Sequence, residues 1–119
     1  MRMKLLPLIT VLGLGASINA ALAHAELVTA TPRVGSTVTV APAEVRLSFS
    51  EGVEPHFSGV EVTSPDGRSV AAGRVQVQGV EMRVALVRGL SSGIYRVTWH
   101  VVSVDTHRSQ GSFTFEVRP

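Results

Sequence analysis

Strict alternation of apolar and polar residues is the feature that most constrains how this chain can fold. From Ala25 onwards the chain consists of short alternating runs separated by turn residues, and no segment carries a convincing helical period. In one clear run, Val45, Leu47 and Phe49 alternate with polar neighbours, which is typical of a strand with one buried and one solvated face. The pattern therefore predicts an all-β chain.

The spacing of the turns indicates how the strands are arranged. Turn signals such as those at residues 64–67 and 91–93 recur about every 8 to 12 positions and leave room for about seven strands. Residues 95–103 have the bulkiest apolar face, and Gly111 is expected to bend the chain into a last strand at residues 112–117. This spacing predicts a two-sheet Greek-key β-sandwich of the immunoglobulin-like or cupredoxin-like kind.

The N-terminal segment has the composition of a secretory signal peptide. Residues 1–4 are basic, residues 5–15 form an apolar run, and residues 16–23 are rich in small side chains. The apolar run is too short to cross a bilayer comfortably. We therefore expect a cleaved signal peptide followed by one domain, with no membrane insertion of the mature chain.

Two cleavage frames satisfy the rule for small residues before the cut. Cleavage after Ala23 would leave His24 as the first residue, and cleavage after Ala25 would leave Glu26 first. The rule does not choose between them. The difference matters chemically, because an N-terminal histidine offers both an α-amine and an imidazole to a single metal ion.

Charge and cysteine content exclude several classes of function. Removing Arg2 and Lys4 from the eleven basic residues leaves nine, against nine acidic residues, with the arginines scattered singly. A mature chain without a basic patch has no electrostatic footprint for nucleic acid or anionic lipid. The chain has no cysteine, which excludes disulfides, thiolate metal sites and cysteine nucleophiles. Met82 is the only methionine beyond the leader and is expected to pack in the core.

The stretch Val104-Asp105-Thr106-His107 follows the bulkiest strand and carries the best candidates for metal ligands. In an extended backbone Asp105 and His107 would project to the same side while Thr106 faced away. The same pattern also fits an ordinary turn with an exposed histidine, because aspartate bonds readily to its own backbone. A metal site needs a further source of ligands, which His24 would supply after cleavage at Ala23.

An ordered set of short motifs resembles the CopC-type periplasmic copper-binding proteins from residue 24 to the end of the chain. The motifs are His24 after the leader, Thr31-Pro32 with Gly35-Ser36, Leu47-Ser48-Phe49-Ser50-Glu51, Phe57-Ser58-Gly59, Gly93-Ile94-Tyr95-Arg96-Val97-Thr98-Trp99, Val102-Ser103-Val104-Asp105-Thr106-His107, and Gly111-Ser112-Phe113-Thr114-Phe115. The resemblance implies a β-sandwich that binds one Cu(II) ion through the amine and imidazole of His24, with Asp105 and His107. Glu51 corresponds to a glutamate that lies near the copper in some members. The resemblance also selects cleavage after Ala23, which gives a signal peptide over residues 1–23 and one copper-binding domain over residues 24–119.

The resemblance further implies a periplasmic protein that sequesters or carries Cu(II) in copper homeostasis or resistance. We do not expect an enzyme, because the sequence shows neither a substrate face nor a Ser/His/Asp arrangement. Some relatives have a methionine-rich Cu(I) site, and the absence of such a segment here implies a site for Cu(II) alone. The expected partner is an inner-membrane CopD-type copper transport protein. Two other interpretations are a histidine-brace-like copper oxidase that uses the same residues and a structural sandwich module with incidental metal binding.

Overall fold

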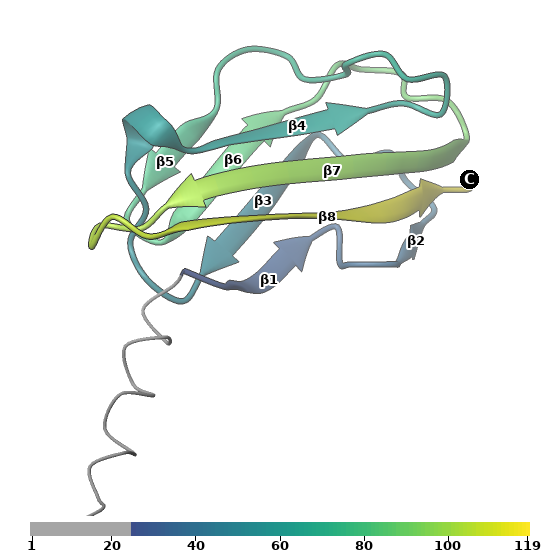
Figure 1. Ribbon diagram of the computed structural model, residues 1–119. Coiled ribbons are helices and arrows are strands. Elements are labelled where there is room, and N and C mark those ends of the chain that lie inside the picture. The colour runs from purple at the N-terminus through teal and green to yellow at the C-terminus, as the bar shows by residue number, and fades with distance from the viewer. Residues whose placement is uncertain (1–24) are drawn as a thin grey trace, which may run out of the picture.

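The computed structural model describes residues 25–119, so the predicted signal peptide and His24 lie outside the described residues. The described chain forms eight β-strands, and its single helical element is the 3₁₀ turn η2 at Pro55–Phe57 (Figure 1). The strands are β1 (Leu27–Thr31), β2 (Thr37–Val38), β3 (Glu44–Phe49), β4 (Gly59–Thr63), β5 (Gln76–Gln78), β6 (Glu81–Ala85), β7 (Gly93–Val102) and β8 (Arg108–Val117). The predicted all-β class is confirmed. Among these residues, no helix has the length and apolar character needed to cross a membrane.

The strands form two four-stranded sheets that face each other. One sheet has the order β1-β3-β6-β5 and the other the order β2-β8-β7-β4. All strand pairs are antiparallel except β2 with β8, which run parallel over two residues. Strands β7 and β8 pair along their full length of ten residues and form the longest ladder of the fold. The predicted β-sandwich is confirmed.

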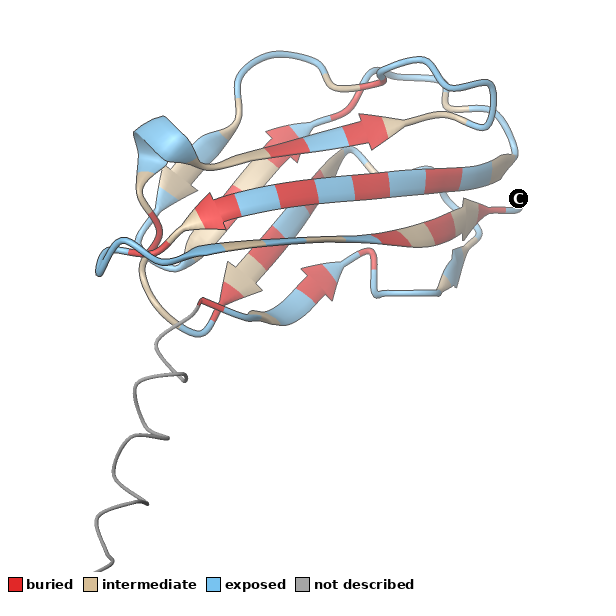
Figure 2. Ribbon diagram, in the orientation of Figure 1, coloured by how far each residue is buried: buried red, intermediate tan, exposed pale blue. Residues whose placement is uncertain are grey.

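The core lies between the two sheets and follows the alternation seen in the sequence. Along β7, buried and exposed residues alternate at almost every position (Figure 2). Strand β3 contributes Val45 and Leu47, and β6 contributes Met82, all of them fully buried. Met82 is therefore a core residue, as predicted.

Two aromatic pairs stabilise the core. Trp99 on β7 meets Phe49 on β3 edge to face with ring centroids 5.1 Å apart, so this pair joins the two sheets. Tyr95 stacks on Phe115 of the neighbouring strand with centroids 5.5 Å apart. The buried Tyr95 hydroxyl donates a 2.7 Å hydrogen bond to the backbone carbonyl of Ser91, which satisfies its only polar group.

Strand β8 differs from its prediction in two respects. It begins at Arg108, four residues before the expected start, because Gly111 does not bend the chain. Instead, Gly111 pairs with Trp99 inside the regular ladder, and a Cβ atom added there would lie 2.6 Å from Trp99 Cζ2. Glycine is therefore needed at this position to make room for the indole ring.

Four connecting segments meet at one end of the sandwich, which we call the loop end. They are residues 25–26, 50–58, 79–80 and 103–107. Backbone hydrogen bonds tie them together: Ser50 N donates to Glu26 O, Val53 N to Gly79 O, and Val104 N to Gly52 O. The start of β1 and the β7–β8 loop consequently lie at the same end of the molecule (Figure 1).

We predict that Gly111→Ala lowers the free energy of unfolding by about 1 to 3 kcal/mol, because the new methyl group overlaps the buried Trp99 ring. Gly59→Ala is the matched control, since a Cβ there would meet only the exposed His100 ring, 2.8 Å away, and that ring can rotate. Urea unfolding of both variants measures the difference. Equal losses in the two variants would contradict this account of Gly111.

Candidate metal centre

The β7–β8 loop brings together two of the predicted ligands. Residues 103–107 connect the strands, and within this loop the Asp105 Oδ1 and His107 Nδ1 atoms lie 3.3 Å apart. Both side chains are nearly half exposed. A carboxylate and an imidazole are thus held side by side at the surface of the loop end, where an ion can reach them.

The backbone that holds this pair is a tight turn, which is the second of the two conformations considered from the sequence, and not an extended strand. Val104 and Asp105 form the turn, and Thr106 has a φ of 73°, in the left-handed region that β-branched residues rarely occupy. The reason is geometric, because five residues must reverse the chain between two adjacent antiparallel strands. The Asp105–His107 pair arises from this reversal rather than from the alternation of a strand.

Ser103 organises the loop and was not identified as important in the sequence. Its side chain is fully buried, and its hydroxyl donates a hydrogen bond to Asp105 Oδ1 and accepts one of 3.2 Å from His107 N. Its backbone N donates a 2.8 Å bond to His107 O. The signal that could have found it is a serine two residues before the aspartate, since serine often bonds to nearby polar groups in turns.

The charge state of Asp105 follows from these contacts. The hydrogen bond from Ser103 is the main cause that lowers the pKa of the Asp105 carboxyl below its usual value. Partial burial opposes this effect, and His107 adds to it through a hydrogen bond and its charge. Asp105 therefore remains a carboxylate at neutral and mildly acidic pH, which is the form that binds a metal ion.

The segment around Glu51 lies between the two parts of the candidate centre. On one side, Ser50 Oγ accepts a 2.8 Å hydrogen bond from Glu26 N, and Ser50 N donates to Glu26 O. On the other side, Gly52 O accepts a hydrogen bond from Val104 N. Glu51 thus lies in the strip of backbone that separates residues 25–26 from the β7–β8 loop.

The described residues contain two of the predicted metal ligands and Glu51, which is an additional candidate. Within residues 25–119, no group of three or more His, Cys, Asp or Glu side chains is placed to hold an ion. Asp105 and His107 form a pair, and His24 falls outside the described residues. His100 is exposed on the outer face of β7, and its ring lies over Gly59 of the neighbouring strand.

Comparison with known proteins finds one matching domain family and several similar proteins. The CopC domain family matches residues 27–118. The chain is 41% identical over 99 residues to "Protein YobA" of Escherichia coli K12, covering 81% of this chain and 80% of that protein. It is 37% identical over 119 residues to "Copper resistance protein C" of Pseudomonas syringae pv. tomato, covering 92% and 94% of the two chains. It is also 32% identical over 98 residues to "Copper transport protein CutJ" of Bacillus subtilis, covering 80% of this chain but 18% of that protein.

Solved structures show the same architecture. The crystal structure of CopC from Methylosinus trichosporium OB3b superposes with a TM-score of 0.74 at 31% identity, covering 81% of this chain and 95% of that one. The structure of PcoC, a methionine rich copper resistance protein from Escherichia coli, superposes with a TM-score of 0.69 at 34% identity, covering 81% and 100%. Residues 25–119 of this chain are not rich in methionine. They contain one methionine, Met82, which is buried in the core.

We predict that Ser103→Ala lowers the free energy of unfolding by about 1 to 3 kcal/mol, because it removes the hydrogen bonds that the buried hydroxyl donates to the Asp105 carboxylate and accepts from His107 N. Ser109→Ala is the matched control. Among the described residues, the Ser109 hydroxyl is a buried polar group without a hydrogen-bond partner, so its removal should cost nothing. Chemical denaturation distinguishes the two variants, and equal stabilities would contradict the assigned role of Ser103.

The same variant should change the titration of Asp105. Because folding lowers the pKa of this carboxyl, its contribution to stability is present above the ordinary aspartate range and is lost as the pH falls through the lowered value. In Ser103→Ala the pKa should rise, so that this loss begins at a higher pH. Carboxyl-detected NMR titration of both proteins measures the pKa, and an unchanged value in the variant would rule out the Ser103 hydroxyl as its main cause.

Proposed function

The chain belongs to the CopC family, and on that premise we propose that it is a periplasmic Cu(II)-binding protein that sequesters or carries copper in copper homeostasis or resistance. The observation that carries the proposal is the 3.3 Å approach of Asp105 Oδ1 to His107 Nδ1 on an exposed loop. The names of the relatives, which refer to copper resistance and copper transport, support copper as the cargo.

The remaining ligands in this proposal come from His24. Consecutive Cα atoms are about 3.8 Å apart, so the peptide bond to Ala25 ties His24 to the loop end of the sandwich. Ala25 is part of the hydrophobic core, which favours cleavage after Ala23, since cleavage after Ala25 would remove a core residue. The mature chain would then begin at His24, whose α-amine and imidazole chelate the ion beside Asp105 and His107.

The proposed donor set suits Cu(II). One amine, two imidazoles and a carboxylate form a nitrogen and oxygen set that matches the tetragonal preference of this ion, and the Irving–Williams order favours Cu(II) over zinc. One such set holds one ion per chain. Glu51 is the candidate for an additional oxygen ligand, because its backbone segment separates residues 25–26 from the β7–β8 loop. Met82 is buried, so no thioether of the described residues is available at the surface for Cu(I).

Two observations support a copper carrier rather than a copper oxidase or a structural sandwich module. The β7–β8 loop offers two ligands on an exposed turn, where a partner can reach the ion during transfer. The match to part of a longer copper transport protein fits delivery of copper to or from a CopD-type inner-membrane protein. Peroxide formation with ascorbate well above that of free copper would instead support the oxidase.

We predict that the exported protein begins at His24 and gains the mass of one copper ion. Intact mass spectrometry with and without Cu(II) reports the cleavage site and the stoichiometry together. In the mature protein, His24→Ala and His107→Ala should each weaken Cu(II) binding by at least about a hundredfold, since each removes a ligand. His100→Ala is the control and should leave the affinity unchanged. A mature chain that starts at Glu26 would end the proposal.

We also predict that Cu(II) affinity at about pH 5 is at least about tenfold lower than at pH 8. Free imidazoles titrate near about 6.5 and α-amines near about 7.7 to 8, and both must lose a proton to bind the ion. Asp105 does not contribute to this loss, because its pKa is lowered and it stays ionised at both values. Competition titrations with a chelator of known affinity measure the change. Equal affinity at the two pH values would speak against amine and imidazole ligands.

A further inference from the structure

The charges of this sandwich are divided between its two ends. The four segments of the loop end, residues 25–26, 50–58, 79–80 and 103–107, carry four carboxylates and no arginine or lysine. These carboxylates belong to Glu26, Glu51, Glu54 and Asp105. The arginine nearest to this end in sequence is Arg108, which begins β8 and lines a groove on the outer face of the sheet with Phe57 and His100.

The opposite end has the reverse charge. Four arginines lie there against two carboxylates, and two of the arginines form ion pairs with these carboxylates. The residues are Arg33, Arg68, Arg88, Arg118, Asp66 and Glu116. Although the mature chain is neutral in total, its long axis therefore runs from an acidic end to a basic end. Such a distribution orients a charged partner before contact.

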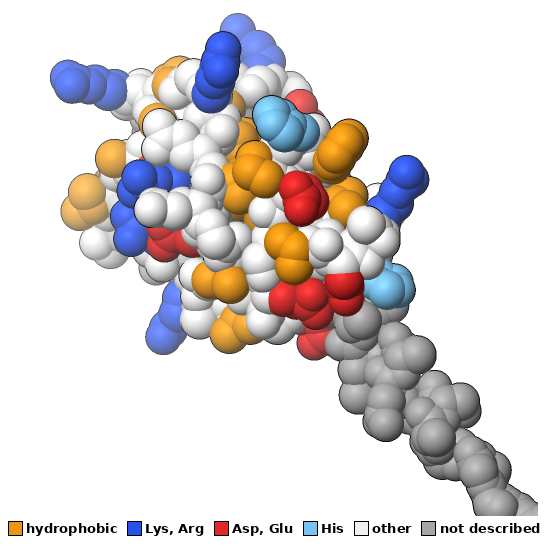
Figure 3. Space-filling model, turned by 90° about the vertical axis from the view of Figure 1, so that its left-hand side faces the viewer, with side chains coloured by type: hydrophobic (Ala, Val, Ile, Leu, Met, Phe, Trp, Pro, Cys, Tyr) orange, Lys and Arg blue, Asp and Glu red, His pale blue; other side chains and the backbone are white. Residues whose placement is uncertain are grey.

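Exposed apolar side chains lie among the carboxylates of the loop end. Val104 is 60% exposed and Val80 is 43% exposed. A Cβ atom added to Gly52 would lie 3.3 Å from Val104 Cγ1 and 3.8 Å from Gly79 O, so Val104 covers a glycine backbone that runs beside the 79–80 turn. Figure 3 views this end directly and shows apolar and acidic side chains intermingled near the middle of the face. The result is a face on which apolar and acidic side chains lie next to one another (Figure 3).

We propose that the loop end is a docking surface for a protein that carries arginine or lysine side chains next to apolar ones, and that this protein gives copper to the chain or takes it. Charge complementarity selects the partner. Basic side chains of the partner would pair with Glu26 and Glu54, and apolar side chains of the same partner surface would cover Val80 and Val104. The identity of the partner as a copper donor or acceptor rests on the proposed function. The docking surface itself rests only on the geometry and charge of residues 25–119.

Two other occupants fit this end less well. An anionic lipid surface would be repelled by the four carboxylates. A second copy that presents the same end would place like charges together, which opposes association. These occupants remain distinguishable by experiment.

The test uses the mature chain free of metal, labelled with ¹⁵N, and two synthetic peptides. One peptide alternates arginine and leucine, and the other alternates glutamate and leucine. With the arginine peptide, the amide resonances of Gly52, Val80 and Val104 should shift, and the shifts should shrink as the salt rises from about 20 to 300 mM. With the glutamate peptide, these resonances should not move.

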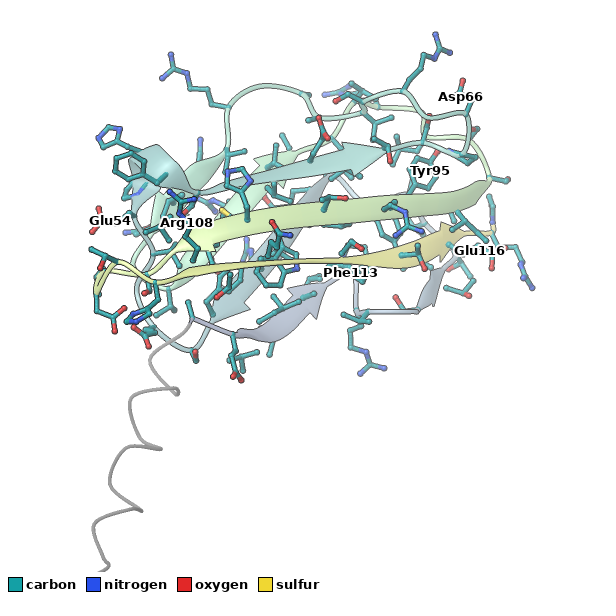
Figure 4. The ribbon with its side chains drawn as sticks, viewed as in Figure 1. Glu54, Asp66, Tyr95, Arg108, Phe113 and Glu116 are labelled. Atoms are coloured by element: carbon teal, nitrogen blue, oxygen red, sulfur yellow. The ribbon has the colours of Figure 1, made fainter. Side chains whose placement is uncertain are left out.

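Variants separate the contributions of charge and apolar contact. The double variant Glu26→Gln/Glu54→Gln and the single variant Val104→Ser should each weaken binding of the arginine peptide at least about fivefold. Their controls are Asp66→Asn/Glu116→Gln and Ile94→Ser, which should have no effect. Figure 4 shows that Asp66 and Glu116 lie at the opposite end from Glu54, and Ile94 is 57% exposed at the start of β7.

Several outcomes would overturn the proposal. Equal shifts with both peptides, or shifts scattered over the sheets, would show that binding is not specific to this end. Shifts that depend on protein concentration alone would indicate a second copy as the occupant. Shifts caused by phosphatidylglycerol vesicles would indicate a lipid surface. Because no metal is present, the result does not depend on copper binding. A chain that binds the arginine peptide at this end but not Cu(II) would contradict the proposed function alone.

Discussion

The antiparallel ladder between β7 and β8 is the constraint on which the rest of this structure depends. Its ten residue pairs fix the register of both strands, and the register determines where the connecting loop begins and ends. A slip of one residue would turn Trp99 and Phe113 out of the core, so burial of these large side chains keeps the ladder in place. The position of Asp105 and His107 at the loop end is therefore set by hydrophobic packing along the strands.

Within the loop, hydrogen bonding replaces packing as the organising force. Ser103 directly follows β7 and is fully buried, and its hydroxyl donates to Asp105 while its backbone N donates to His107 O. These bonds hold Thr106 in a left-handed conformation that a threonine rarely adopts. A strained conformation of this kind persists only where the surrounding contacts hold it in place, and here the hydrogen bonds of the buried Ser103 do so. Hydrogen bonds thus fix the backbone of the loop where its two candidate ligands meet.

Periodicity in the sequence predicted most of the fold, because burial on one face forces a period of two residues. It predicted the strands around Val45 and Tyr95. Residue type also singled out Asp105 and His107, but their approach comes from the chain reversal and not from a period of two. It did not predict β2, because Thr37 and Val38 are held by backbone bonds to β8 without an apolar alternation of their own. It also misread Gly111, since the close approach of the Trp99 ring depends on a strand that is distant in sequence.

The candidate centre combines a local part with a distant part, and the two differ in what creates them. Asp105 and His107 are close in sequence, so the loop can present both whenever β7 and β8 are paired. Residues 25–26 reach the same end only because Ser50 holds Glu26 with two hydrogen bonds and Ala25 joins the core. A ligand set that spans both parts exists only in the folded chain. Metal bound by such a set stabilises the native state relative to the unfolded one, and the fold in turn determines the affinity.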